Sequence, residues 1–252
     1  MRIILACAAA LLLVSAVAPR QQPYLWLKSY DPAQCIAARI APPAGYEREA
    51  SAAGTYEDWL RHLPLKKGSP QVLLYDGKEK ANQDAHVAVI DLDVGDRDLQ
   101  QCADSVIRLR AEYLFMAGWH ADIHFNFTSG DRADFVKWTE GFTSVVKGNS
   151  VQWVRGKPRP ATYATLRSYL NMVFSYAGTA SLSQELTPVD DPARMRIGDV
   201  FIKGGVTGTR GCCGRHGGEQ DDGQEGISLG TGFHARPGNA CVEKSPVNVP
   251  LV

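Results

Sequence analysis

The hydrophobic pattern of the chain breaks off within residues 197–223, IGDVFIKGGVTGTRGCCGRHGGEQDDG. Up to Gly205 this segment is typical of a buried strand with a polar beginning, whereas from Val206 onward it shows neither a helical nor a strand period. Residues 206–252 hold ten of the 24 glycines. A segment so rich in glycine and charge buries too little apolar surface to offset the entropy lost on ordering. The sequence therefore predicts that the folded domain ends near Gly205.

The amino-terminal residues, MRIILACAAALLLVSAVAPRQQ, carry one early positive charge and then an apolar run from Ile3 to Ala18. This run is shorter than the roughly 20 residues that a membrane-spanning helix needs. We therefore interpret residues 1–18 as a secretory signal peptide. We expect an exported protein, in the periplasm, in the cell envelope or secreted, with no stable membrane span once the signal is removed. Retention of the signal as an anchor is the alternative.

Charge and motifs exclude several classes of function. The formal net charge is +0, which gives no electrostatic reason to expect binding to nucleic acid. The sequence has no phosphate-binding loop, no GxSxG and no HExxH motif. The adjacent Cys212 and Cys213 do not match the C-x₂-C spacing that lets two thiolates bind one zinc ion. We therefore expect neither a metal nor a cofactor.

Both helical and strand periods occur before Gly205. Apolar residues at helical spacing predict helices over residues 98–117 and 162–178. Continuous or alternating apolar residues predict strands over 86–94, 121–128 and 197–203, and 86–94 should be central because both of its faces are apolar. We expect a single α+β domain, residues 19–205, in which these strands form one sheet packed on the helix that carries Cys102.

Five stretches of the chain carry a family resemblance: LPLKKGSPQVLLYDGKEKANQ, DLDVGDRDLQQCADSVIRLRAEYLF, IHFNFTSGDR, VFSYAGTASLSQEL and IGDVFIKGG. Together they resemble an uncharacterised bacterial family, domain of unknown function 4846, over residues 36–205. The resemblance implies that a GDVFI.GG motif is followed by Pro-Gly-His and a hydrophobic strand. This chain departs from that pattern at Val206.

A base lost or gained in the gene near Gly205 would account for the departure. With synonymous codons chosen for residues 206–252, reading one base later permits LPGHAVVVVDMAENKTTGKK, a strand and turn of the kind that the family shows. We therefore interpret residues 206–252 as an aberrant, frameshifted tail without regular structure. The domain would be truncated, its C-terminal strands lost and the sheet edge beside 197–203 unpaired. A flexible secreted tail is the alternative, and the coding DNA distinguishes the two.

Two residues are candidates for catalysis, Cys102 and His124. Cys102 lies in the first turns of the predicted helix, where the backbone amides and the helix dipole favour the reactive thiolate. A nucleophilic cysteine also needs a histidine that accepts its proton, and His124 stands on a predicted strand near this helix. In the shifted reading, the histidine of LPGHAVVVVD would begin a further strand. A helix Cys followed by a strand His is similar to the papain-like NlpC-type peptidases, and this similarity implies a papain-like fold.

Structural roles remain open for both residues. Cys102 shares a helix face with Leu99 and Val106, which is also typical of a small buried cysteine. A disulfide between Cys35 and Cys102 would exclude the nucleophile. A histidine on a polar strand face, as His124 is, is often only solvated or hydrogen-bonded.

These observations lead to two hypotheses about function. The first is an exported cysteine hydrolase of the cell envelope that cleaves peptide or amide bonds, with peptidoglycan or an envelope protein as its partner. Because the strand histidine is lost in the frame as written, we expect this chain to be inactive. The second is a non-enzymatic envelope or lipid-associated protein of the same fold.

Overall fold

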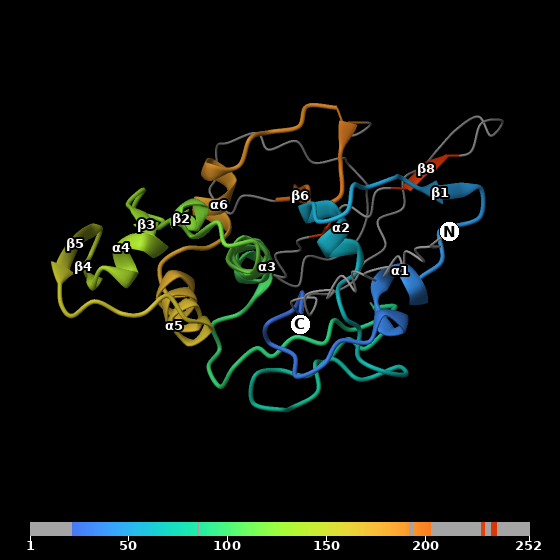
Figure 1. Cartoon of the computed structure of the whole chain (residues 1–252), viewed down its shortest axis with the longest axis horizontal. Coiled ribbons are helices and arrows are strands. Elements are labelled where there is room, and N and C mark those ends of the chain that lie inside the picture. The colour runs from blue at the N-terminus through green and yellow to red at the C-terminus, as the bar shows by residue number, and fades with distance from the viewer. Residues whose placement is uncertain (1–21, 85, 192–193, 203–227, 230–232, 236–252) are drawn as a thin grey trace, which may run out of the picture.

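The structure is a computed structural model that describes residues 22–84, 86–191, 194–202, 228–229 and 233–235 (Figure 1). Its 3₁₀ helices are η1 (Pro32–Gln34) and η2 (His120–Asp122). Its α-helices are α1 (Ile36–Arg39), α2 (Tyr56–Arg61), α3 (Cys102–Met116), α4 (Phe135–Thr139), α5 (Tyr163–Phe174) and α6 (Thr179–Glu185). Its strands are β1 (Tyr46–Arg48), β2 (His124–Asn126), β3 (Arg132–Asp134), β4 (Phe142–Lys147), β5 (Ser150–Arg155), β6 (Val200–Phe201), β7 (Ser228–Leu229) and β8 (Phe233–Ala235).

The described strands form small antiparallel sheets of two strands each, which pair β1 with β8, β2 with β3, β4 with β5, and β6 with β7. Together with the helices they confirm the predicted α+β class. The prediction of one sheet that contains residues 86–94, 121–128 and 197–203 is wrong. Of these ranges, 121–128 contributes only β2 and 197–203 only β6, and the two strands lie in different sheets.

The segment 86–94, predicted as the central strand, is buried only at residues 88–90 and at Leu92, and it belongs to no sheet among the described residues. Ala88, Val89 and Ile90 are buried, but the segment pairs only through an isolated bridge from Ile90 to Leu65. Burial of apolar side chains requires contact with a core and not a ladder of backbone hydrogen bonds. A continuous apolar run therefore could not distinguish a central strand from an extended segment that packs against helices.

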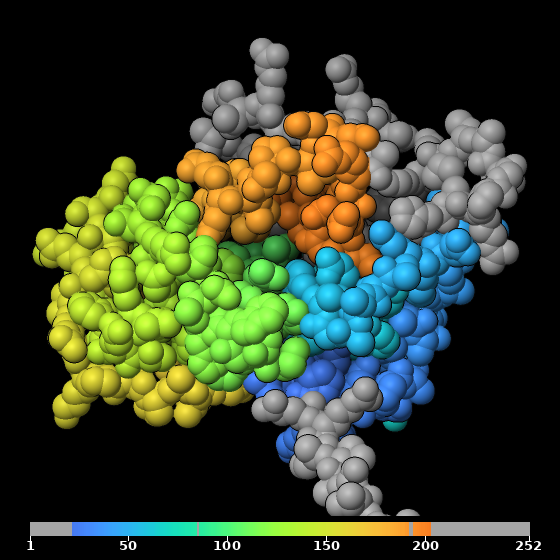
Figure 2. Space-filling model, turned by 45° about the horizontal axis from the view of Figure 1, so that its top comes forward, coloured from blue at the N-terminus to red at the C-terminus, as the bar shows by residue number. Residues whose placement is uncertain are grey.

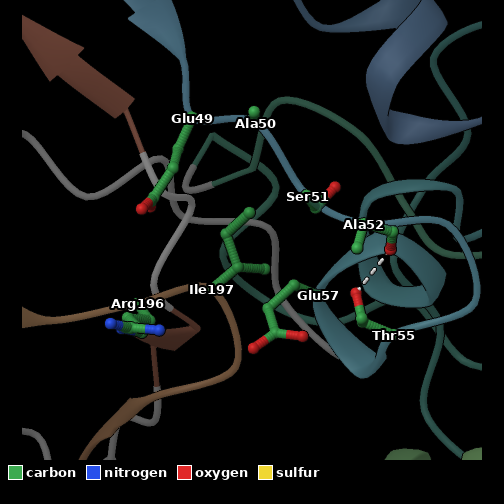
Figure 3. A pocket seen from close by; sticks show the side chains of 8 residues that line it. All are labelled: Glu49, Ala50, Ser51, Ala52, Thr55, Glu57, Arg196 and Ile197. Carbon is green, nitrogen blue, oxygen red and sulfur yellow. Dashed lines mark hydrogen bonds between the residues drawn. The ribbon is translucent and has the colours of Figure 1, made fainter.

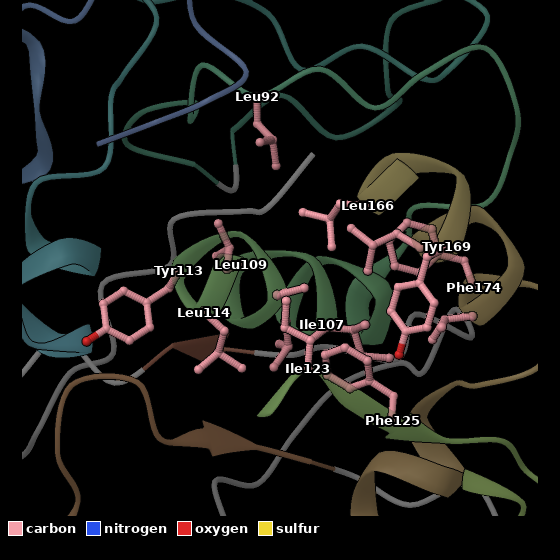
Figure 4. Close-up of a cluster of buried hydrophobic side chains, with 14 of the residues drawn as sticks. Leu92, Ile107, Leu109, Tyr113, Leu114, Ile123, Phe125, Leu166, Tyr169 and Phe174 are labelled. Atoms are coloured by element: carbon pink, nitrogen blue, oxygen red, sulfur yellow. The ribbon is translucent and has the colours of Figure 1, made fainter. Parts of the chain in front are cut away.

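The longest helix, α3, occupies the middle of the molecule and is buried on nearly all sides. In Figure 1 it is seen almost end-on, with α5 and the β4–β5 hairpin to one side and α2 to the other. Eleven of its fifteen residues are buried. Its Ile107 and Leu109 pack with Leu166 and Tyr169 of α5 and with Phe125 of β2 (Figure 4). The helix predicted over 98–117 is thus present, but other helices surround it where a sheet was expected.

The start of α3 is set by local hydrogen bonds. Gln101 is the N-cap residue, and its backbone N–H donates to the Asp104 carboxylate over 3.2 Å. Asp98, at which the predicted helix 98–117 begins, instead accepts from the side-chain amide of Gln101 over 3.3 Å. The helix therefore begins at Cys102, later than predicted, because the reciprocal contact between residues three apart forms from Gln101 to Asp104.

The second predicted helix is confirmed as α5. The Thr162 hydroxyl caps it by accepting from the backbone N–H of Thr165 over 3.3 Å. Its buried side chains, including Leu166, Leu170 and Val173, recur at helical spacing and face the core. This agreement follows from a strong amphipathic pattern that the core can satisfy only in a helix.

Part of the carboxyl-terminal tail has backbone structure. The short strands β7 and β8 lie within residues 206–252, and β7 pairs with β6. The prediction of a tail without regular structure does not hold for these residues, nor does that of an unpaired edge beside 197–203. Backbone pairing needs no apolar period, and the sequence argument rested on that period. Cys212, Cys213 and residues 1–18 lie outside the described residues.

No helix in the described part of the chain is both long enough and apolar enough to cross a membrane.

Candidate active site at the start of α3

Cys102 is the first residue of α3, as the hypothesis of a nucleophile requires. Its side chain is partly buried, and it is not in a disulfide. Cys35 is buried, 2% exposed, and is not in a disulfide either, so the alternative of a Cys35–Cys102 bond does not hold in this structure. The backbone N–H groups of the first turn of a helix have no partners within the helix, and they favour negative charge. The start of α3 therefore places the Cys102 thiol beside backbone N–H groups of the first helical turn.

His124 lies on β2 and is paired with an acidic residue from α6. Its Nδ1 is 3.4 Å from the carboxylate of Glu185, and the other oxygen of that carboxylate accepts from the backbone N–H of Asn126 over 3.0 Å. A carboxylate held in this way can orient an imidazole ring. Among the described residues, the side chain of His124 contacts the Glu185 carboxylate, and no contact between His124 and Cys102 is described. The role of these residues in catalysis stays a prediction.

Asp104 adds an acid to the first turn of α3, two residues after Cys102. It is only 8% exposed. Burial raises the pKa of its carboxyl from the ordinary 3.8 to about 6, although the backbone N–H of Gln101 donates to it and works in the opposite direction. Burial outweighs the hydrogen bond here because the charged form loses its water. Asp104 therefore takes up a proton at a higher pH than an exposed aspartate does.

We expect Asp104→Asn to raise the free energy of unfolding by about 2 kcal/mol at pH 7 and to leave it unchanged near pH 3. The pKa is higher in the folded state than in the unfolded state. The cost of the buried charge therefore appears as the pH rises from 3.8 to about 6. Urea unfolding at several pH values measures this difference. The exposed control Asp122→Asn should show no such dependence on pH. Equal profiles for the two variants would contradict the assignment.

A buried cluster of polar side chains lies next along α3, centred on Arg108. Arg108 is 0% exposed and donates from Nε to the Glu112 carboxylate over 2.6 Å. Its Nη1 donates to the Gln100 side-chain oxygen over 2.8 Å and to the Asp93 carbonyl over 3.1 Å. Its Nη2 donates to the Tyr163 hydroxyl over 3.2 Å and to the Asp93 carboxylate over 3.4 Å. These contacts occupy all five N–H donors of the guanidinium group.

The cluster connects three parts of the fold. Tyr163 is the first residue of α5, and Glu112 lies on α3. Asp93 lies in the segment that precedes α3. The Tyr163 hydroxyl donates to the Glu112 carboxylate over 2.8 Å, and Arg167 of α5 pairs with Asp93 over 3.1 Å. Burial lowers the pKa of Arg108, but Glu112, Tyr163 and Asp93 together raise it by more, so the guanidinium group stays charged. The sequence did not predict this cluster, because Asp93 and Tyr163 are far from Arg108 along the chain.

A separate cavity of about 170 Å³ lies between residues 49–57 and residues 196–197 (Figure 3). Neither Cys102 nor His124 is among the residues that line it. In the part of the chain that the structure describes, no group of three or more His, Cys, Asp or Glu side chains is arranged to bind a metal ion.

Comparison with known proteins gives one match. The sequence profile of a family described as Domain of unknown function (4846) matches residues 36–211. This confirms the resemblance noted from the five stretches of sequence. No curated protein and no solved structure shows significant similarity to the chain. The similarity to NlpC-type peptidases and the papain-like fold therefore have no support from these comparisons.

Proposed function

We propose that this chain, which belongs to the family of domain of unknown function 4846, carries a nucleophilic thiol at Cys102 and has the architecture of a cysteine hydrolase. The observation that supports the proposal is the position of Cys102 at the start of α3, partly exposed and outside any disulfide. A fifteen-residue helix carries a partial positive charge at this end. That charge stabilises a thiolate and also the oxyanion that forms when a carbonyl is attacked.

The reaction would proceed through a thioester. The Cys102 sulfur would bond to the carbonyl carbon of an amide while its proton passes to a base, and the first-turn amides of α3 would donate to the oxyanion. The C–N bond then breaks, the base returns the proton to the departing amine, and water hydrolyses the thioester. In an exported protein the amide would belong to peptidoglycan or to an envelope protein. A papain-like arrangement of the strands would supply the base.

His124 is the candidate base in the chain as written. The Glu185 carboxylate, 3.4 Å from its Nδ1, lies where an orienting carboxylate for such a histidine would lie. The histidine of the shifted reading is the alternative base, and it is absent from this sequence. If the latter is the true base, this chain retains the reactive thiol and does not turn over substrate. A protein with the restored frame, compared with its Cys102→Ala variant, tests turnover.

A non-enzymatic envelope or lipid-associated protein is the second candidate. Two observations favour it: His124 is paired with Glu185 and not with Cys102, and the cavity near residues 49–57 is lined by neither residue. Under this proposal Cys102 is a structural residue of α3, and the fold serves binding alone.

Thiol labelling separates the two candidates. We expect iodoacetamide to alkylate Cys102 at pH 7 about tenfold faster in the folded protein than in the urea-unfolded chain, because only the folded helix stabilises the thiolate. Cys35 is the internal control, since it is buried and should react more slowly when the protein is folded. Peptide mapping by mass spectrometry measures both rates in one sample. Slower labelling of Cys102 in the folded protein would leave only the non-enzymatic candidate.

A further inference from the structure

The cavity of about 170 Å³ joins two segments that are far apart in the sequence. One wall is formed by residues 49–57, which lead from β1 into α2, and the other by Arg196 and Ile197, which precede β6. Figure 2 shows the orange segment before β6 lying against the cyan region of α2. The cavity is therefore formed by tertiary packing, and no local sequence motif predicts it.

Packing against α2 holds the two walls at a defined separation. Gly198 has a φ of +98°, and a Cβ atom placed there would lie 3.2 Å from the Tyr56 ring and 3.3 Å from a Leu60 methyl group. The backbone after Ile197 thus contacts α2 as closely as a residue without a side chain allows. On the other wall, the Tyr113 hydroxyl donates to the carbonyl of Gly54 over 2.9 Å. The cavity is preformed, which reduces the entropic cost of binding a ligand.

Opposite charges line this cavity. Figure 3 shows the carboxylates of Glu49 and Glu57 and the guanidinium of Arg196 around the side chain of Ile197. Within the described residues, the ion pairs include neither Glu57 nor Arg196. Arg196 is held by its backbone, since its N–H donates to the Asp199 carboxylate over 2.7 Å. Both charged groups can therefore bind a ligand that carries the complementary charges.

Size and the apolar part of the lining limit what that ligand is. Ile197, Ala50 and Ala52 supply apolar surface between the charged groups. Pockets for drug-sized ligands have volumes of roughly 300–1,000 Å³, so a cavity of about 170 Å³ accepts a smaller molecule. A single amino acid combines an ammonium, a carboxylate and an apolar side chain in a molecule of this size.

We propose that the cavity binds a free α-amino acid with an apolar side chain. The ligand carboxylate would pair with Arg196, its ammonium group with Glu57, and its side chain would contact Ile197. A guanidinium group binds a carboxylate through two parallel N–H donors, which makes it selective for that group. This inference is independent of the thiol chemistry proposed for Cys102, because the cavity is lined by neither candidate catalytic residue.

Titration calorimetry with three related ligands tests the proposal on the whole protein. L-Leucine should bind with a Kd of about 1 mM or tighter, a range suited to so small a ligand. N-acetyl-leucine lacks the ammonium charge and leucine methyl ester lacks the carboxylate. Each should bind at least about tenfold more weakly, because each leaves one charged group of the protein without a partner. Absence of leucine binding, or equal binding of all three ligands, would overturn the proposal.

Variants assign each charge to its residue. In Arg196→Gln we expect leucine and its methyl ester to bind equally, and in Glu57→Gln we expect leucine and N-acetyl-leucine to bind equally. The exposed Arg194, which does not line the cavity, provides the control Arg194→Gln, which should keep the preference for free leucine. If either cavity variant keeps that full preference, the cavity is not the binding site. The three ligands test the wild-type protein alone, so the proposal does not depend on the folding of any variant.

Discussion

Replacing Arg108 with methionine should lower the free energy of unfolding by about 3 to 5 kcal/mol, the cost of breaking a buried ion pair from one side. The substitution leaves the Glu112 carboxylate, which is 1% exposed, without its cationic partner. It also removes donors from the Gln100 side chain and from the carbonyl of Asp93. Methionine fills much of the same volume, so the loss reports on the polar contacts more than on packing. Urea unfolding followed by tryptophan fluorescence measures the change.

Arg110 is the matched control, since it lies on the same helix and is exposed. Arg110→Met loses a contact of its guanidinium with the Tyr56 ring, 5.0 Å from the ring centroid, and should cost less than about 1 kcal/mol. The double variant Arg108→Met/Glu112→Gln should recover part of the loss, because the amide carries no charge into the interior. A loss for Arg108→Met no larger than that for Arg110→Met would show that the cluster does not hold the fold together.

Replacing Gly141 with alanine should also cost more than about 3 kcal/mol, because the substitution combines backbone strain with a clash. Gly141 has a φ of +101°, and a Cβ atom there would lie 2.6 Å from the carbonyl oxygen of Gly156 and 2.8 Å from the Lys157 carbonyl group. These are backbone atoms, so relief requires the ends of β4 and β5 to separate. This separation would also break the hydrogen bond from the Gly156 N–H to the Gly141 carbonyl, which is 2.9 Å long.

Gly148, in the turn of the same β4–β5 hairpin, is the control for this prediction. Its φ is +58°, and a Cβ atom there would meet no heavy atom within 4 Å. Gly148→Ala should therefore cost only about 1 kcal/mol, the penalty for a left-handed residue without a clash. Thermal unfolding of the two variants compares them directly. Similar losses in both would mean that the close approach of Gly141 to Gly156 does not contribute to stability.

Helix α5 could be predicted from the sequence because its apolar pattern needs only one partner surface. Residues of α5 such as Leu166 and Val173 recur on one face, and a core on that side satisfies them. The strands were predicted poorly for the opposite reason. Residues 88–90 are buried as expected, but whether a buried extended segment joins a sheet depends on which backbone lies beside it, and that information is not local.

In the candidate site, too, one feature could be predicted from the sequence and another could not. The position of Cys102 near a helix start is a local property, because the contact between Gln101 and Asp104 that begins α3 spans three residues. The pairing of His124 with Glu185 spans 61 positions and joins β2 to α6. No spacing rule predicts such a contact. The thiol hypothesis therefore rests on the sequence, whereas the contact of Glu185 with His124 was found only in the fold.

By itself, the sequence determined the α+β class, the helices α3 and α5, the thiol near a helix start and the family to which the chain belongs. These properties depend on residues within a few turns of one another, where side-chain period and capping decide the outcome. The tertiary structure alone decided the burial of Arg108 with Glu112 and Tyr163, and the cavity between Glu57 and Arg196. A charge becomes buried, or faces an opposite charge across a cavity, only when distant segments pack together. The contribution of such a contact to the free energy of folding therefore depends on both segments together, and it cannot be read from either segment alone.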